Sequence, residues 1–260
     1  MNKNDIRLID EAIGNESVKN TFRLGWEFIV LNKKFTAIAM VIVMILNLLG
    51  SLPTVGVLFL LMSGVFSMII QIYIGKHLYG TDNIETLVNG INGATVKEAV
   101  QTHANTAWGA YVGWIFLMMF IMTIFSFFIA SLGLEKEALV QMDLLALLNL
   151  FSPLIIFILL LSYVQPLVQA NIIMANNFQE ALKAVFTLFS IPLWKSAFQK
   201  KYFVYIAKVE GIIMMAIIAV MSLMYLLPPF SIFLSIFLYI YIVMMSVSAV
   251  MAKRMVEELK

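Results

Sequence analysis

The sequence predicts an all-α fold, a polytopic membrane bundle of six transmembrane helices with amphipathic elbow helices at its cytoplasmic face. Of its 260 residues, 62% are hydrophobic and 12% are charged, and the mean hydropathy is +0.95. A soluble domain has about 45–50% apolar and about 25% charged residues. A core of this size cannot hide so many apolar side chains, so we expect a bilayer to cover the excess.

Six segments are long and apolar enough to cross a bilayer, which takes about 20 residues of α-helix. They are residues 35–52, 54–75, 108–132, 144–164, 211–227 and 230–251. Pro53 separates the first two segments, and Pro228-Pro229 separates the last two. Each of these pairs is therefore predicted to form a tight antiparallel hairpin.

The basic residues predict the orientation, because positively charged loops stay in the cytoplasm. All but one of the 17 basic residues lie in segments that six spans place on a single side. The exception is Lys136, in a short loop that also carries Glu135, Glu137 and Asp143. Both termini are thus predicted to be cytoplasmic. The expected divisions are an amphipathic segment 1–34 and a membrane domain 35–260, with cytoplasmic segments at 76–107 and 165–210.

A polar segment with helical spacing of its apolar residues precedes each of the three successive pairs of spans, and each pair is read as a hairpin. In the first such segment, one face carries Val18, Phe22, Trp26 and Ile29. This spacing is typical of an amphipathic helix lying at the membrane interface. The second and third polar segments are residues 81–106 and 177–201. An elbow followed by a hairpin thus occurs three times, which indicates either an internal repeat or the residue types shared by any lead-in helix beside a membrane.

The first elbow also carries a resemblance to known proteins. It reads Phe22-Arg23-Leu24-Gly25-Trp26-Glu27-Phe28 and is followed by the basic pair Lys33-Lys34 and the first predicted span. This pattern resembles bacterial six-helix inner-membrane proteins of the YciC type, and the membrane domains attached to some glycerophosphodiester phosphodiesterases are similar. The later run Phe178-Gln179-Glu180-Ala181-Leu182 has the same style. The resemblance implies an inner-membrane protein and brings no catalytic residue to this chain.

The composition argues against several kinds of chemistry. The chain has no cysteine, which excludes disulfides and thiolate metal sites. It also lacks a phosphate-binding Gly-rich loop, a dinucleotide fingerprint, G-x-S-x-G and H-E-x-x-H. Neither His77 nor His103 has a histidine or carboxylate three or four residues later, so we expect both to face solvent near the headgroups. We predict no catalytic residue, no metal, no cofactor and no nucleic-acid partner.

The fourth predicted span carries a polar stripe. Ser162, Gln165, Gln169 and Asn176 fall within about 60° of one another on a continuous helix, and Pro166 lies among them. Such a stripe indicates a substrate path or a gating helix. The alternative interpretation is a set of interhelical hydrogen bonds in an ordinary bundle.

Lys208 and Glu210 are the charged residues nearest to the apolar part of the fifth span. Residues two apart on a helix point in different directions, so these two cannot pair with each other. We add both to the candidate ligand path, with snorkelling toward the cytoplasm as the alternative.

Small residues at helical spacing predict where helices pack closely. In the second span these are Gly56, Ser63 and Ser67, which Gln71 continues at the same spacing. In the third span they are Gly109 and Gly113, spaced as G-x-x-x-G. Both stripes are predicted to be helix-packing faces.

These observations predict a non-enzymatic, multi-pass protein of the bacterial inner membrane that organises envelope lipids or supports a membrane complex. Its expected partners are membrane lipids, with a homo-oligomer and a partner membrane subunit as further expectations. The alternative function is a permease, either alone or as the membrane subunit of an ATP-driven transporter with a separate ATPase subunit. The bacterial source is inferred from composition, since Lys greatly outnumbers Arg and both Asn and Ile are plentiful.

Overall fold

The computed structural model describes residues 9, 13, 16–81, 83–132, 143–226 and 231–257. The regular structure in these ranges is helical, and they contain no strand. The predicted all-α fold is therefore confirmed. The predicted loop around Lys136 and the turn at Pro228-Pro229 lie outside the described residues.

Six helices are long and apolar enough to cross a membrane. They are α3 (Lys33–Gly50), α4 (Gly56–Gly80), α6 (Val96–Ser131), α8 (Leu144–Met174), α11 (Lys200–Leu226) and α12 (Ser231–Glu257). Each contains most or all of one predicted span, so the fold is that of a multi-pass membrane protein.

Several of these helices begin or end well outside the apolar segment that predicted them. Thr95 is the N-cap of α6, and its hydroxyl oxygen accepts the Glu98 backbone N–H at 3.2 Å. The helix therefore begins at Val96, ahead of the predicted start at Trp108. Hydropathy marks only the apolar part of a helix, whereas caps set its ends. Helix likewise fills much of the two predicted cytoplasmic segments, 76–107 and 165–210.

Shorter helices cover the ends of the long ones. They are α2 (Ser17–Leu31), α5 (Ile84–Gly93), α9 (Phe178–Phe186), the 3-10 turn η2 (Thr187–Phe189) and α10 (Ile191–Ala197). Asparagine starts two of them, because the side chains of Asn83 and Asn177 accept backbone N–H groups at 2.9 Å in the first turns of α5 and α9.

The first elbow helix is present, and the face that it packs against the protein is distinct from the apolar face predicted to lie at the membrane interface. The predicted face included Trp26, whose side chain is 56% exposed. The buried residues of α2 are Thr21, Leu24, Gly25 and Phe28. The physical reason is a close approach to α12, since a Cβ at Gly25 would lie 2.5 Å from Met244 Sδ. Gly25 allows this close approach of α2 to the Met244 side chain.

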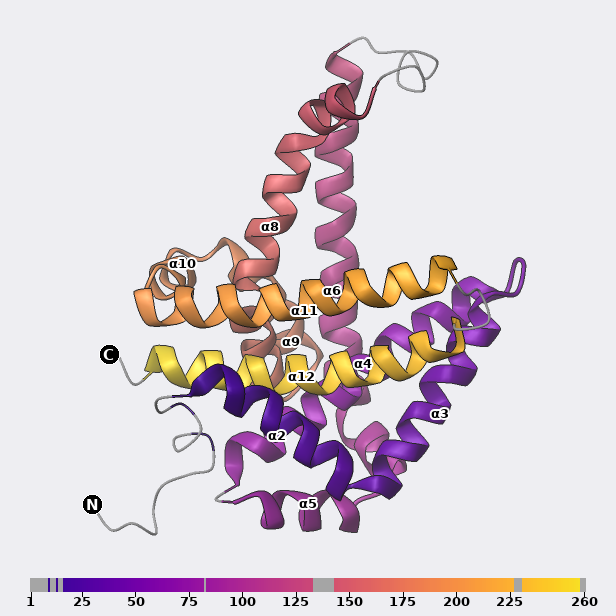
Figure 1. Cartoon of the computed structure of the whole chain (residues 1–260), viewed down its shortest axis with the longest axis vertical. Helices are drawn as coiled ribbons and strands as arrows, with labels where there is room; N and C mark the ends of the chain where they lie inside the picture. The colour runs from indigo at the N-terminus through magenta and orange to yellow at the C-terminus, as the bar shows by residue number, and fades with distance from the viewer. Residues whose placement is uncertain are drawn as a thin grey trace.

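The helices form two arms that diverge from a common base (Figure 1). One arm is formed by the parts of α6 and α8 that stand away from the remainder of the molecule, while the rest of these two helices packs against α4, α9 and α12. The other contains α11 and α12 side by side, with α3 and α4 next to them. The short helices α2 and α5 lie together at the base, and α9 lies against α6 and α8. The core lies where α12 meets α4, α8 and α2.

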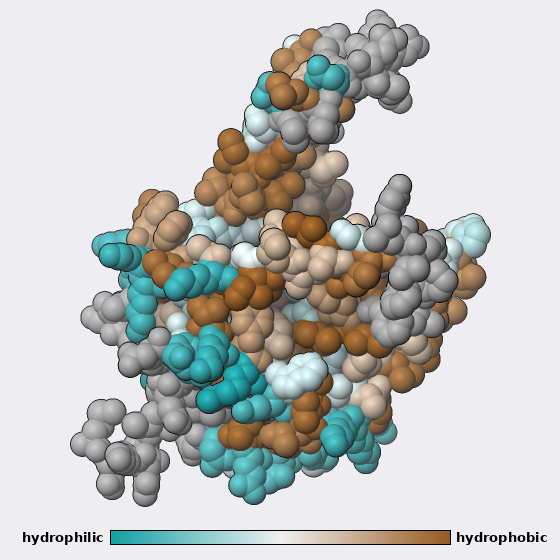
Figure 2. Space-filling model, in the orientation of Figure 1, coloured by the Kyte–Doolittle hydropathy of each residue, from teal (hydrophilic) through white to brown (hydrophobic). Residues whose placement is uncertain are grey.

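The two arms differ in how much of their surface the protein itself covers. In α12, 67% of the most apolar window is buried, against 11% in α6. Phe127 on α6 is 72% exposed, and Phe116, Met119 and Phe120 are more than half exposed. Figure 2 shows apolar surface on both arms and polar surface concentrated at the base. A bilayer around the arms would cover this apolar surface.

The glycines of α6 lie against the short helix α9. A Cβ at Gly109 would be 2.2 Å from the Phe178 carbonyl oxygen, and one at Gly113 would be 2.9 Å from Val185 Cγ2. The two helix backbones therefore approach as closely as the G-x-x-x-G spacing allows. The partner is an elbow helix at the base, not another span.

The other small-residue stripe lies in the α3–α4 hairpin. A Cβ at Gly56 would be 2.3 Å from the Gly50 carbonyl oxygen, so two glycine backbones meet at the turn. Ser63 Oγ donates a hydrogen bond to Asn47 Oδ1 at 3.1 Å. Ser67 and Gln71 are half-buried on α4.

We predict that Gly109→Ala lowers the free energy of unfolding by about 1–3 kcal/mol, because the new methyl group would push α9 away from α6. Gly211→Ala is the matched control, since nothing lies within 4 Å of a Cβ there. That control should be neutral or stabilise the helix by about 0.5–1 kcal/mol. Thermal unfolding followed by circular dichroism in detergent measures both. Equal effects would contradict the α6–α9 contact.

The absence of cysteine makes the predicted orientation directly testable. Lys97 and Leu52 are exposed at opposite ends of the long helices. We expect Lys97→Cys to react with a membrane-impermeant maleimide only in inside-out vesicles, and Leu52→Cys to react in intact cells. The reverse labelling pattern would invert the orientation.

Candidate functional site

A basic groove runs between the start of α2 and the first half of α11. It has a volume of about 790 Å³. Its lining residues are Glu16, Ser17, Val18, Lys19, Lys200, Lys201, Val204, Tyr205 and Lys208. Four lysines and one glutamate give this lining three excess positive charges at neutral pH.

The Glu16 carboxylate in the basic groove forms an ion pair with Lys19. Lys19 Nζ lies 2.8 Å from Glu16 Oε2, and this hydrogen bond lowers the pKa of the Glu16 carboxyl group. The ion pair is exposed, so its own contribution to stability is small. Lys200, Lys201 and Lys208 line the α11 side of the groove.

A hydrogen-bonded pair beneath the groove fixes α2 to α11. Thr21 Oγ1 donates to the Ser17 carbonyl oxygen at 2.8 Å, so its proton is used. The Tyr205 hydroxyl, 2.9 Å from Thr21 Oγ1, must then be the donor in that contact. Both side chains are buried. This pair is not predictable from the sequence, because no local pattern links residues so far apart in the chain.

The structure separates the two charged path candidates. Lys208 is exposed and lines the basic groove. Glu210 is half-buried, and its Oε1 atom is buried without a hydrogen-bond partner among the described residues. The two side chains therefore face different surroundings.

The polar stripe of α8 does not face a single path. Gln169 is buried, and its Nε2 donates to Met68 Sδ on α4 at 3.4 Å. Asn176 is exposed and accepts a hydrogen bond from Lys76 at 3.2 Å. Ser162 is half-buried. The stripe thus divides among several neighbours.

Gln165 is the member of the stripe that meets another candidate. Gln165 on α8 and Glu210 on α11 both lie near the Tyr241 side chain on α12. We call Gln165, Tyr241 and Glu210 the intramembrane cluster. It joins three of the long helices.

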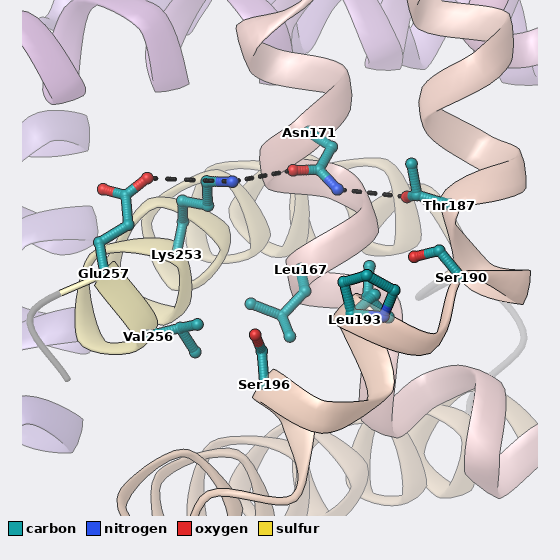
Figure 3. A pocket seen from close by; sticks show the side chains of 10 residues that line it. Leu167, Asn171, Thr187, Ser190, Leu193, Ser196, Lys253, Val256 and Glu257 are labelled. Carbon is teal, nitrogen blue, oxygen red and sulfur yellow. Dashed lines mark hydrogen bonds and ion pairs between the residues drawn. The ribbon is translucent and has the colours of Figure 1, made fainter. Parts of the chain in front are cut away.

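A polar brace ties the ends of α8, η2 and α12 together around a cavity of about 200 Å³ (Figure 3). Lys253 Nζ donates to Asn171 Oδ1 at 3.1 Å, and Asn171 Nδ2 donates to Thr187 Oγ1 at 3.2 Å. Glu257 lies 3.9 Å from Lys253 and accepts a hydrogen bond from Tyr79 at 2.8 Å. These groups partner one another, so the arrangement fits a structural role.

The two histidines do not behave alike. His77 is partly exposed, whereas His103 is only 7% exposed. The expectation that both face solvent is therefore wrong for His103, because α6 begins earlier than predicted and turns this residue toward α4. Within the described part of the chain, no group of three or more histidine, aspartate or glutamate residues could hold a metal ion.

Comparison with known proteins adds no relative. No family model, curated protein or solved structure matches the chain. The resemblance of the first elbow to YciC-type proteins stays a prediction, and any function must follow from the geometry of the chain itself.

Proposed function

We propose that this chain is a non-enzymatic multi-pass protein of the bacterial inner membrane that binds anionic lipids and organises the lipids around it. The observation that carries the proposal is the basic groove. Lysines placed next to a membrane surface attract anionic headgroups, each with about 1 kcal/mol. The basic groove collects four of them against one carboxylate.

The surface next to the groove suits the rest of a lipid. Val204, Lys208 and Ile212 follow one another at intervals of four residues, so they share a face of α11. Val204 is 41% and Ile212 is 47% exposed. If Lys208 holds the phosphate of a lipid headgroup, the acyl chains of that lipid would extend along Ile212 toward the apolar end of the helix.

The amphipathic helix α2 supports the same function. It lies against α11 and α12, and Trp26 and Leu31 remain exposed on its outer side. Helices of this kind lie in the plane of the membrane interface, and tryptophan prefers the headgroup level. In this arrangement, α2 would form the outer wall of a lipid-binding groove.

We predict that replacing Lys200, Lys201 and Lys208 together by Gln weakens anionic lipid binding roughly a hundredfold. This estimate follows because each lysine contributes about 1 kcal/mol of binding free energy. Native mass spectrometry of the purified protein with phosphatidylglycerol measures the loss. The control replaces three exposed lysines on other helices, Lys97, Lys183 and Lys195, by Gln. Equal lipid occupancy in the two triple variants would overturn the proposal.

A second candidate function, a permease, is favoured by the intramembrane cluster. Glu210 lies within a span, and the described residues provide no cation to pair with its buried oxygen. An ionisable group at membrane depth is expensive and usually marks an ion or proton path. Gln165 and Tyr241 supply the polar neighbours that such a path requires.

If the chain is a proton-coupled permease, proteoliposomes loaded with a pH-sensitive dye should acidify when a membrane potential is imposed. Glu210→Gln removes the ionisable group and should slow proton entry at least about tenfold. Glu98→Gln, on the exposed start of α6, is the matched control and should have no effect. Proton entry no faster than in empty liposomes would exclude this second candidate.

A further inference from the structure

A second cleft lies between the end of α4, the helix α5 and the start of α6. Its volume is about 480 Å³, and it shares no lining residue with the basic groove. Its lining includes the ionisable side chains of Lys76 and His77 on α4, and of Glu98 and His103 on α6. We call this space the histidine cleft.

Three groups that can carry positive charge meet in the histidine cleft. Lys76 and His77 both lie close enough to His103 to act on its ring electrostatically. Lys76 already donates to Asn176 Oδ1 at 3.2 Å, and the nearby carboxylate of Glu180 is exposed. Lys76 supplies the positive charge of the cleft, and the two imidazole rings add N–H groups that can donate to an anionic ligand.

The hydrogen bonding of His77 leaves one ring nitrogen for a ligand. Its Nδ1 atom lies 2.8 Å from the Tyr73 carbonyl oxygen. A carbonyl oxygen only accepts, so Nδ1 carries the proton and Nε2 at the other edge of the ring has no partner in this contact. A protonated His77 would therefore donate through Nε2.

Tyr73 lies in the wall of the cleft and contacts both histidine rings. Tyr73 is 3% exposed, and its hydroxyl oxygen is buried without a hydrogen-bond partner in the described ranges. Its ring stacks on Phe35 and lies 4.3 Å from the His77 ring and 5.8 Å from the His103 ring. The Tyr73 ring therefore holds both imidazole rings in place beside the cleft.

The charges also decide against a metal ion. Two histidines and Glu98 line the cleft, yet they form no group of three that could hold a metal among the residues described. The ammonium group of Lys76 beside His103 further opposes a cation. Glu98 is the carboxylate in this lining, and it is exposed at the start of α6.

We infer that the histidine cleft binds a phosphate group through Lys76, His77 and His103. This site is independent of the lipid function proposed for the basic groove, because it lies on other helices. The phosphate belongs either to a small soluble phosphate compound or to a lipid headgroup, and the same three side chains would recognise both.

Isothermal titration of the purified full-length protein with inorganic phosphate tests the site. The Lys200, Lys201 and Lys208 to Gln variant serves as the background, so that the basic groove cannot contribute. In this background Lys76→Gln and His77→Gln should each raise the Kd about tenfold or more, since each removes a charged hydrogen bond. Lys97→Gln on α6 should leave the Kd unchanged.

Glu98→Gln provides a test of opposite sign. Removing this carboxylate should tighten phosphate binding several-fold, an effect that loss of folding cannot imitate. No phosphate binding in the background protein, unchanged binding in Lys76→Gln, or weaker binding in Glu98→Gln would each overturn the inference.

Competition identifies the source of the phosphate. Displacement of bound phosphate by phosphatidic acid in detergent micelles, but not by glycerol phosphate, assigns the site to a lipid. Displacement by glycerol phosphate assigns it to a soluble compound. Both outcomes support a phosphate site.

Discussion

The burial of α12 is the interaction on which the rest of the structure depends. This helix packs against α2, α3, α4, α8 and α11. Close packing is possible because its inner positions are small, including Ser246, Ser248, Ala249 and Ala252, which are all fully buried. In a bilayer, helices associate through such small-residue contacts, since lipid removes the hydrophobic driving force between them. Loss of this packing would release α2, and with it one wall of the basic groove.

The polar sites share one construction. In each of them, short helices close the end of long helices: α2 beside α11 at the basic groove, α5 beside α4 and α6 at the histidine cleft, and η2 with α10 beside α8 at the brace. Backbone and side-chain polar groups are costly in hydrocarbon, so they gather where the chain leaves it. The arms, by contrast, present mainly apolar side chains. The molecule is therefore divided into an apolar membrane part and a polar base, and most of the candidate chemistry lies at the base.

The membrane spans are predictable from the sequence, whereas the grouping of residues into sites is not. Hydropathy predicted six apolar segments, and six long apolar helices contain them. The elbow helix α2 was also predictable, but its buried face was not, because the contact between Gly25 and Met244 depends on a helix more than 200 residues later. The lysines of the basic groove were all visible in the sequence. Their grouping around one cavity was not, since Lys19 and Lys208 meet only after α2 has folded onto α11.

The fold class and the number of long helices follow from the amino-acid sequence, because helix formation in a membrane depends on local runs of apolar residues whose backbone bonds are satisfied within each segment. The sequence also determined where close helix packing is possible, since only glycine admits a contact such as that of Gly109. The tertiary structure alone decided the partners: α9 for Gly109, Tyr241 for Gln165, and a buried place beside Lys76 for His103. Partners are set by packing between distant helices, and the periodicity of a single helix contains no information about that packing.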